Sequence, residues 1–440
     1  MPQLRHLSVA LAAALVVVPV RADAAEGWAT LEEAGGHALA IAVGDGTTAL
    51  VSVGGPDEAT VYDQRRAPDG TLGPVTEVLT VPDADYCRPV EAAAAAGSLA
   101  VAVECQQQTD FEDPPTTLAE LVWTGDGGWA WHVRREGVLG SLDFSPRGKF
   151  VAFTSNSQYG RPHHVTSYHP DLGWRDVRRR ERGVNGDTMV AAIDDRGDVV
   201  ALRGAGFEDE PGYWFGGRLA LESYDGDTGR WTERFAQRFP DGGIRPAAID
   251  LVGQRLAVTL VETRSTGKVN GVDERVVLLS GRAGHPRTWS SRWTRGVLTA
   301  DAAITGAGVG LASWQALVEP RVATPRFATW PPSRSRPRVH DLAWRTTTTT
   351  AAAAGEAMDL SVATNGRGVI AWTRHGPGDD HTDVAGATFR VHRSGRISDQ
   401  VDVTWSQPVG VTVEVAASGR GSSVTLGSLS RPGVSYSLGP

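Results

Sequence analysis

The sequence predicts an all-β fold assembled from repeated four-stranded units, and three observations lead to this prediction. Segments in which apolar and polar residues alternate recur along the chain, and a glycine-centred turn joins them in pairs. A tryptophan followed by a charged strand recurs between these hairpins. No segment beyond the N-terminal region keeps a 3.6-residue apolar pattern over three helical turns.

Eight hairpins share the pattern of alternating strand, turn and alternating strand. They begin at residues 37, 90, 140, 188, 245, 298, 357 and 411, and the seventh opens with AMDLSVATNGRGVIAW. The glycines that superpose at their turns are Gly46, Gly97, Gly148, Gly197, Gly253, Gly308, Gly368 and Gly421. Their spacings run from 49 to 60 residues, so one unit repeats along the chain with a variable length.

A tryptophan-led strand completes each unit. It is visible in DGGWAWHVRR from residue 126, DLGWRDVRRR from 171, DTGRWTERF from 227 and HPRTWSSRW from 285. Four-stranded units with a period near 50 are typical of the blades of a β-propeller. We therefore expect eight blades, or seven if the sixth unit, whose second half at residues 331–356 is interrupted by prolines and a Thr/Ala run, is irregular.

The two ends of the chain complement each other. The last unit supplies only three strands, and residues 26–36 (EGWATLEEAGG) have the pattern of the missing one. Pairing the ends closes the ring and leaves no open sheet edge where it closes. We expect residues 25–440 to form this single propeller domain.

Residues 1–24 have the pattern of a secretory signal peptide. A basic start precedes an apolar run from Leu7 to Val20, and Ala22-Asp23-Ala24 supplies an A-x-A cleavage site. No later stretch is long and apolar enough to predict a transmembrane segment. We expect a secreted monomer, located outside the cell or at the cell envelope.

The two cysteines predict one disulfide. Cys87 and Cys105 lie symmetrically about the turn at Ala96-Gly97, so they face each other across an antiparallel pair. An exported protein is the setting in which such a bond forms and persists. The flanking residues include no group that would activate a catalytic thiol.

Composition and motifs exclude several functions. The formal net charge of -8 argues against a nucleic-acid partner, because such proteins display basic patches. The chain contains no G-x-S-x-G, H-E-x-x-H or P-loop motif and no dinucleotide fingerprint in a strand-helix context. We therefore assign no catalytic residues and expect no cofactor.

The combination of hairpins and tryptophan-led strands resembles exported β-propeller repeat proteins of GC-rich bacteria, which are similar to WD40-like, TolB-like and sialidase-like propellers. The segment SYDGDTGRW, residues 223–231, resembles the Tyr-Asp turn of a kelch repeat and, more loosely, the turn of sialidases. In either family this turn is structural. The resemblance implies that Asp225 bonds turn amides and that Trp231 packs between blades, and it implies a fold rather than an activity.

The first strand of each blade is expected to line the axis, where space favours small residues. The alanines that fit this position are Ala38, Ala40, Ala42, Ala92, Ala94, Ala247, Ala248, Ala300 and Ala302. The loops between second and third strands then gather on one face, where propeller ligands usually bind. Four of these loops stand out, at residues 106–115, 157–170, 206–217 and 374–383.

Two of these loops carry the candidate ligand-binding residues, which are Glu208, Asp209, Tyr213, Trp214, Asp379, Asp380 and His381. Carboxylates beside aromatic rings suit a sugar, which stacks on a ring while the acids accept its hydroxyls. Alternatively, the loops are merely solvated and Trp214 begins a buried strand. We expect no metal site, because the acidic loop at 379–383 lacks the ligand order of a calcium loop.

The sequence thus favours a non-enzymatic binding or scaffold module that recognises a glycan or protein ligand through its loop-rich face. The alternative is a carbohydrate-active enzyme, a glycoside hydrolase or lyase, with a carboxylate pair at the axial mouth. Two carboxyl groups about 5 to 9.5 Å apart with an aromatic ring nearby would favour the enzyme.

Overall fold

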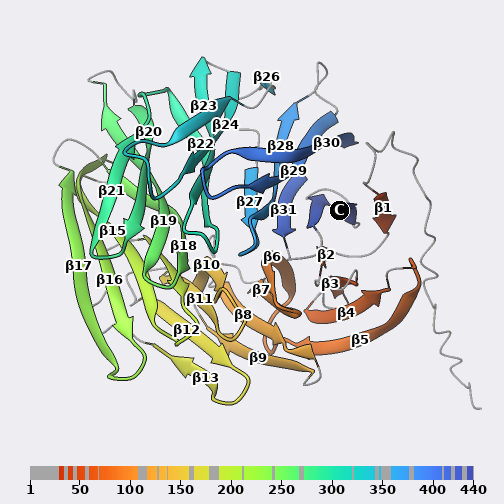
Figure 1. Cartoon of the computed structure of the whole chain (residues 1–440). Helices are drawn as coiled ribbons and strands as arrows, with labels where there is room; N and C mark the ends of the chain where they lie inside the picture. The colour runs from red at the N-terminus through yellow and green to blue at the C-terminus, as the bar shows by residue number, and fades with distance from the viewer. Residues whose placement is uncertain are drawn as a thin grey trace, which may run out of the picture.

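The computed structural model consists of sheets arranged around a common axis (Figure 1). It describes residues 29–439 except for residues 34–37, 43–46, 55–58, 68, 108–115, 126–127, 136, 158–162, 178–187, 211–212, 240–242, 267–271, 320–321, 342–345, 348–357, 376–380, 409–410, 418–421 and 429–433. Seven sheets have four strands and an eighth has five, and neighbouring strands are antiparallel throughout. This is the β-propeller that the sequence predicts, in its eight-bladed form.

The first four blades follow the chain in order. Blade 1 contains β2 (Ala38–Ala42), β3 (Thr48–Gly54), β4 (Thr60–Arg66) and β5 (Leu72–Thr80). Blade 2 contains β6 (Tyr86–Ala95), β7 (Ser98–Gln106), β8 (Thr116–Trp123) and β9 (Trp129–Arg134). Blade 3 contains β10 (Gly137–Phe144), β11 (Val151–Ser157), β12 (His164–His169) and β13 (Gly173–Asp176). Blade 4 contains β14 (Thr188–Ile193), β15 (Val199–Glu210), β16 (Tyr213–Asp225) and β17 (Arg230–Phe239).

The remaining four blades complete the ring. Blade 5 contains β18 (Ile244–Val252), β19 (Arg255–Ser265), β20 (Val272–Arg282) and β21 (His285–Ser290). Blade 6 contains β22 (Gly296–Ile304), β23 (Gly310–Glu319), β24 (Val322–Trp330), β25 (Arg338–Asp341) and the short β26 (Thr346–Thr347). Blade 7 contains β27 (Met358–Val362), β28 (Arg367–His375), β29 (His381–Val391) and β30 (Ile397–Pro408). Blade 8 contains β31 (Val411–Ala417), β32 (Ser422–Ser428), β33 (Val434–Gly439) and β1 (Ala29–Glu33).

The N-terminal strand closes the ring as the sequence predicts. Strand β1 pairs with β33, with Ala29 opposite Leu438 and Glu33 opposite Val434, and lies beside the C-terminal strand in Figure 1. The first strand of each blade contacts the first strands of the neighbouring blades, and β2 also contacts β31 and β32 of the last blade. The irregular sixth unit still forms a blade, because residues 338–341 pair with β24 as its fourth strand.

Apolar side chains fill the space between blades. In β7, Leu99, Val101 and Val103 pack into a core shared with blade 1, whereas Ala100 and Ala102 on the opposite face pack against blade 3. Because successive residues of a strand point to opposite faces, a second strand with a blade on each side must be apolar at nearly every position. Burying one such aliphatic side chain contributes about 1.5 to 3 kcal/mol, so these interfaces hold the ring together.

The turns between first and second strands confirm most of the predicted register. Gly97, Gly148, Gly197, Gly253 and Gly308 all have the positive φ that glycine adopts without strain, whereas Gly46 and Gly421 lie outside the described residues. In the seventh hairpin the prediction of Gly368 is wrong. Gly366 is the turn residue with positive φ, and Gly368 already belongs to β28 opposite Val362, so the second strand begins earlier than the sequence suggested.

The tryptophan-led segments form fourth strands as predicted. Trp129, Trp174, Trp231 and Trp289 lie in β9, β13, β17 and β21. Trp231 contacts the ring of Tyr224 at 5.4 Å and packs on a core that includes side chains of blade 3. The carboxylate of Asp225 accepts hydrogen bonds from the amides of Asp227 and Thr228 at 3.0 and 2.8 Å. The segment at residues 223–231 is therefore structural. Among the described residues, no helix has the length and hydropathy that would cross a membrane.

The predicted disulfide between Cys87 and Cys105 is present, and both side chains are fully buried between blades 1 and 2. The two cysteines lie directly opposite each other in the β6–β7 pair. The bond closes a loop with a sequence separation of 18 residues. The bond therefore stabilises the folded state, because it restricts the conformations of the unfolded chain.

We expect the double variant Cys87→Ala/Cys105→Ala to lose about 3 kcal/mol of unfolding free energy, because the unfolded chain regains the closed loop's entropy. Denaturant unfolding followed by tryptophan fluorescence measures this loss. The reduced wild type serves as the control and should unfold near the same denaturant concentration as the variant. Equal stability of oxidised wild type and variant would contradict the prediction.

Candidate functional site

A cavity of about 400 Å³ lies on the propeller axis, surrounded by the first strands of blades 2, 3, 5, 6 and 7, and Val415 of blade 8 also lines it. Small residues create this space, as the sequence predicts. The lining alanines include Ala92, Ala94, Ala247, Ala248, Ala300 and Ala302. The side chains of Ala38, Ala40 and Ala42 lie outside the described set. The cavity extends to the turns that follow the first strands, since Ala96, Pro146 and Thr364 also line it.

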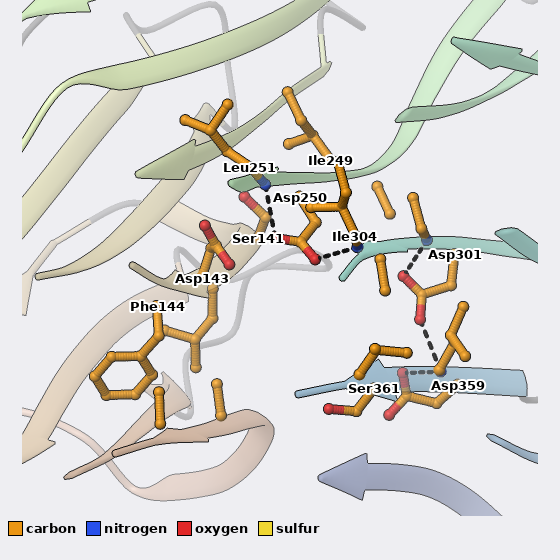
Figure 2. Close-up of a pocket in the computed structure, with 18 of the residues that line it drawn as sticks. Ser141, Asp143, Phe144, Ile249, Asp250, Leu251, Asp301, Ile304, Asp359 and Ser361 are labelled. Atoms are coloured by element: carbon orange, nitrogen blue, oxygen red, sulfur yellow. Dashed lines mark hydrogen bonds between the residues drawn. The ribbon is translucent and has the colours of Figure 1, made fainter. Parts of the chain in front are cut away.

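Each of the five surrounding strands contributes one acidic residue to this cavity. They are Glu91 of β6, Asp143 of β10, Asp250 of β18, Asp301 of β22 and Asp359 of β27. Figure 2 shows four of these carboxyl groups gathered from separate blades. No arginine, lysine or histidine is among the described residues that line the cavity. The axis is therefore a site of concentrated acidic groups without a neutralising side chain.

Each acidic side chain also binds the next blade. Its carboxyl oxygen accepts a hydrogen bond from a backbone amide in the first strand of the blade that follows in the ring. The donor amides and their distances are Leu142 to Glu91 at 3.1 Å, Ile193 to Asp143 at 3.0 Å, Ile304 to Asp250 at 2.6 Å, Leu360 to Asp301 at 2.8 Å and Val415 to Asp359 at 2.6 Å. The same groups that line the cavity thus hold the inner strands together.

Three of the carboxyl groups are held by a second amide. The other oxygen of Asp250, Asp301 and Asp359 accepts a hydrogen bond from the amide of the following residue, at 2.6, 2.6 and 2.7 Å. A carboxyl group with both oxygens bonded to backbone has little freedom to rotate. These groups therefore present a fixed set of hydrogen-bonding atoms to the cavity.

Burial raises the pKa values of four of the five axial carboxyl groups. It raises the pKa of Glu91 to about 8, with the charge of Asp359 adding to the effect, and the pKa of Asp250 to about 6. The pKa values of Asp143 and Asp301 are also well above the usual range, first through burial and then through the neighbouring charges of Asp250 and Asp359. A carboxyl group that keeps its proton both donates and accepts hydrogen bonds. At neutral pH the cavity therefore offers both kinds of partner.

The structure corrects the prediction of a loop over residues 206–217. Glu208 and Asp209 belong to β15, Tyr213 and Trp214 belong to β16, and Glu208 lies directly opposite Trp214. The strands extend here because aromatic residues favour a pleated pairing and the hairpin register continues to Glu210 and Tyr213. Glu208 lies nine residues beyond Val199, about 30 Å along the strand from the turn-side end of the blade. Its backbone is far from the end of the axis to which the cavity extends.

The second candidate loop is only partly described. Asp379 and Asp380 lie outside the described residues, and His381 is the first residue of β29, opposite Pro408 of β30. β28 and β29 are the second and third strands of blade 7, so His375 and His381 lie at the same end of the propeller as Glu210 and Tyr213 of blade 4. A ligand-binding role for these residues stays a prediction.

The histidine-rich segment at residues 157–170 contains no assembled metal site among its described members. His163 is buried, His164 lies 3.5 Å from the Asp176 carboxylate, and His169 contacts the ring of Phe150 at 4.4 Å. Across the described residues, no group of three or more potential ligands is arranged to hold a metal ion. Residues 108–115, which carry the acids of the first loop, lie outside the described residues.

Sequence reasoning missed the axial acids, although each lies inside one of the recognised hairpins. They occur as VEA, LDF, IDL, ADA and MDL in the first strands of five repeats, and the VEV around Glu414 in the eighth repeat follows the same pattern, with a side chain outside the described set. An acid between apolar or small residues, recurring near the centre of an otherwise buried strand, was the available signal. Superposing the first strands rather than the turn glycines would have revealed it.

Comparisons with known proteins extend only to the overall architecture. No family model and no curated protein matches the sequence. Among solved structures, the chain is similar to the β-propeller domain of the Trilobed protease from Pyrococcus furiosus, at 8% identity over 78% of this chain and 93% of that chain, with a TM-score of 0.43. It is also similar to prolyl oligopeptidase B from Galerina marginata, at 9% identity over 91% of this chain and 55% of that one, with a TM-score of 0.47.

A third similar structure is the acylaminoacyl peptidase of Pyrococcus horikoshii, at 9% identity over 80% of this chain and 50% of that one, with a TM-score of 0.46. The chain therefore spans about half the length of the two full peptidases. At this level of similarity, neither peptidase activity nor substrate is transferred to it. The axial site is interpreted from its own geometry.

We expect the free energy of unfolding to fall as the pH rises from about 4 to about 8. The folded protein holds protons on Glu91 and Asp250 that the unfolded chain has already released, so raising the pH favours unfolding. The shift of Asp250 alone corresponds to roughly 3 kcal/mol. Thermal unfolding measured at pH 5 and pH 8 provides the test.

The matched variants are Asp250→Asn, which removes the titrating group but keeps an amide acceptor, and Asp227→Asn on an exposed turn. Asp250→Asn should flatten the pH dependence of Tm, and Asp227→Asn should leave it as in the wild type. A wild-type Tm that increases between pH 5 and pH 8 would contradict the pKa shifts.

Proposed function

We propose that the chain is a binding module whose axial cavity takes a small polyhydroxylated group, such as one residue of a glycan. The observation that carries this proposal is the cavity itself, in which five carboxyl groups converge among small side chains. Pockets of about 300 to 1,000 Å³ with a few convergent polar groups are typical sites for small ligands. Perturbed pKa values in such a pocket add weight to this assignment.

The chemistry of the cavity suits hydroxyl groups. A sugar hydroxyl donates and accepts a hydrogen bond, and a mixture of protonated and ionised carboxyl groups offers a partner for each role. Phe144, which follows Asp143 in β10, turns its ring away from the axial acids and into the core between blades 2 and 3, so the support comes from the polar groups (Figure 2). The alanines leave room for a ring that larger side chains would occupy. These features support recognition through the axis rather than through the opposite, loop-rich end.

Binding receives more support than glycoside hydrolysis. A glycosidase needs one carboxyl group free to give up a proton and a second free to attack or to activate water. Here the carboxyl oxygens are engaged by backbone amides of neighbouring inner strands, and Asp250, Asp301 and Asp359 each accept two amides. Groups that hold the ring together are poor candidates for a proton cycle. The carbohydrate-active enzyme remains the second proposal.

The proposed setting is the cell exterior or envelope. The signal-like residues 1–24 and the buried disulfide between Cys87 and Cys105 support export, because disulfides persist in oxidising compartments. The ring closes with strands from its own two ends, which supports a monomeric module. Such a module would expose its turns and loops to polymers outside the cell.

A glycan array of neutral mono- and disaccharides tests the proposal. We expect the wild type to bind at least one printed sugar, and Ser361→Tyr to weaken that binding by about tenfold or more, because the added ring occupies the cavity that Ser361 lines. Ser394→Tyr places the same change on an exposed turn of the same blade and should bind as the wild type does.

A panel of chromogenic glycosides, assayed with the same proteins, separates binding from hydrolysis. The proposal predicts binding without turnover, and turnover that Asp301→Asn abolishes would favour the enzyme instead. If no printed sugar binds the wild type, or if both tyrosine variants bind equally well, the axial cavity is not a sugar site.

A further inference from the structure

The turn-side end of blades 5, 6 and 7 carries a dense group of arginines. In each blade the turn after the first strand and the turn after the third strand lie at the same end, because successive strands are antiparallel. We call the following nine residues the basic patch: Arg255, Arg282, Arg287, Arg334, Arg336, Arg338, Arg367, Arg393 and Arg396. Seven of them are exposed, and Arg287 and Arg367 are half-buried.

Contacts between the turns make the patch one continuous surface. Within blade 5, the amide of Ala283 donates to the carbonyl of Gln254 at 3.1 Å. The Arg287 guanidinium donates to the carbonyls of Pro332 and Arg334, and so joins blade 5 to blade 6. The hydroxyl of Thr329 donates to the Gly395 carbonyl at 2.8 Å, which joins blade 6 to blade 7.

No acidic residue balances this charge within the turns. Residues 252–255, 282–287, 304–309, 331–338, 363–367 and 392–396 include no aspartate or glutamate. Within the described part of the chain, none of the nine arginines forms an ion pair. The corresponding turns of blade 4 contain Asp194, Asp195, Asp198, Asp225 and Asp227. Like charges therefore gather on blades 5, 6 and 7, in contrast to blade 4, and the pKa of Arg287 is lowered by burial and by the charge of Arg255.

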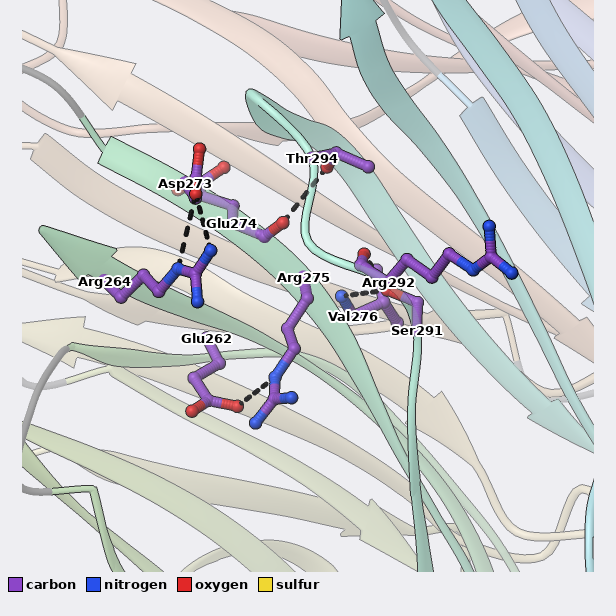
Figure 3. Close-up of polar contacts among 9 residues, drawn as sticks. All are labelled: Glu262, Arg264, Asp273, Glu274, Arg275, Val276, Ser291, Arg292 and Thr294. Atoms are coloured by element: carbon purple, nitrogen blue, oxygen red, sulfur yellow. Dashed lines mark hydrogen bonds and ion pairs between the residues drawn. The ribbon is translucent and has the colours of Figure 1, made fainter. Parts of the chain in front are cut away.

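Arginines at the opposite end of blade 5 are arranged differently, as Figure 3 shows. The guanidinium of Arg264 lies 2.8 Å from the Asp273 carboxylate, and that of Arg275 lies 2.7 Å from the Glu262 carboxylate. Both also stack on the ring of Trp293. Those arginines are paired with acids of their own blade, whereas none of the arginines of the basic patch has such an acidic partner among the described residues. Arg287 is engaged by backbone carbonyls, and the seven exposed arginines present their forked donors to the surface.

We infer that the basic patch is a docking surface for an acidic polysaccharide, in which arginines from neighbouring turns bind successive carboxylates of a uronic-acid polymer. The planar guanidinium pairs with a carboxylate through two parallel hydrogen bonds. Pro331, Pro332 and Pro337 restrict the blade 6 turn, so its arginines lose less freedom on binding. This inference uses a different surface from the axial cavity and does not depend on the sugar site proposed there.

Other polyanions fit this surface less well. Single-stranded nucleic acid needs exposed aromatic rings on which bases stack, and the aromatic residue of these turns, Trp330, is buried with Arg287 above its ring. A membrane surface would call for apolar residues that enter the lipid. Only Val339 at the edge of the patch is both exposed and large. Duplex DNA is bulky and would contact surface beyond the patch, which the net charge of -8 disfavours. A single polysaccharide chain contacts the patch alone.

Binding to polygalacturonate, measured by isothermal titration calorimetry at low salt, tests the inference. We expect the wild type to bind, with an affinity that falls as salt is added. The triple variant Arg334→Glu/Arg336→Glu/Arg393→Glu should lose binding by roughly tenfold or more. The matched control is Arg292→Glu, which changes an exposed arginine at the opposite end of blade 5 (Figure 3). It should bind as the wild type does.

Four outcomes would overturn the inference. The first two are an affinity for uncharged dextran equal to that for polygalacturonate and unchanged binding by the triple variant. The other two are tighter binding to duplex DNA or to vesicles with anionic lipid than to polygalacturonate, and absence of binding to all four probes. Because the three substituted arginines are exposed, the circular dichroism spectrum and the Tm of the triple variant should match those of the wild type. A cavity variant such as Ser361→Tyr should keep polygalacturonate binding, so failure of the axial sugar site is recognised separately.

Discussion

The hydrogen bond between an axial carboxyl group and the first-strand amide of the next blade is the interaction on which the centre of this propeller depends. The first strand of a blade is a sheet edge, and its amides face the axis without a neighbouring strand to accept them. A buried amide without a partner costs free energy, as does a buried carboxyl group. Placing the two within 2.6 to 3.1 Å of each other resolves both costs at once. The apolar packing between blades supplies most of the stabilisation, but these bonds set where each inner strand lies relative to the next.

At the turn-side end of the propeller, acidic groups on the axis are separated from basic groups at the rim. Near the axis, acidic groups without neutralising cations hold their protons to higher pH, which makes the cavity both a donor and an acceptor surface. At the rim of the same end, the turns of blades 5 to 7 present arginines without acids. An average over the chain hides this separation, since the net charge of -8 describes neither the cavity nor the patch. A polymer reaching this end would meet positive charge at the rim and carboxyl groups on the axis.

The elements with strong local signals were predictable from the sequence, and those that depend on placement between blades were not. Alternation, turn glycines and the tryptophan-led strands specify blades because each feature acts within one repeat, and Cys87 and Cys105 specify their own pairing across one hairpin. The β15–β16 tip was misjudged because polar residues such as Glu208 suggest a loop, whereas the continuing register with Trp214 keeps them in strands. The axial acids were overlooked because their role appears only when five strands from separate repeats, distant from one another in the chain, meet at one axis.

Blade 4 shows that a blade can join the ring without contributing an axial acid of its own. Its first strand has Ala191 and Ala192 where the neighbouring blades bring a carboxyl group, yet it packs between blades 3 and 5. In that strand the amide of Ile193 donates to Asp143 of blade 3, but the amide of Ala191 donates to the hydroxyl of Ser141 and that of Met189 donates to the side chain of Asn156. Neutral groups therefore meet the same need at two of these three amides, and acids are harder to bury than hydroxyls and amides. The five described axial acids thus cost more than holding the inner strands requires, which supports the binding role proposed for the cavity.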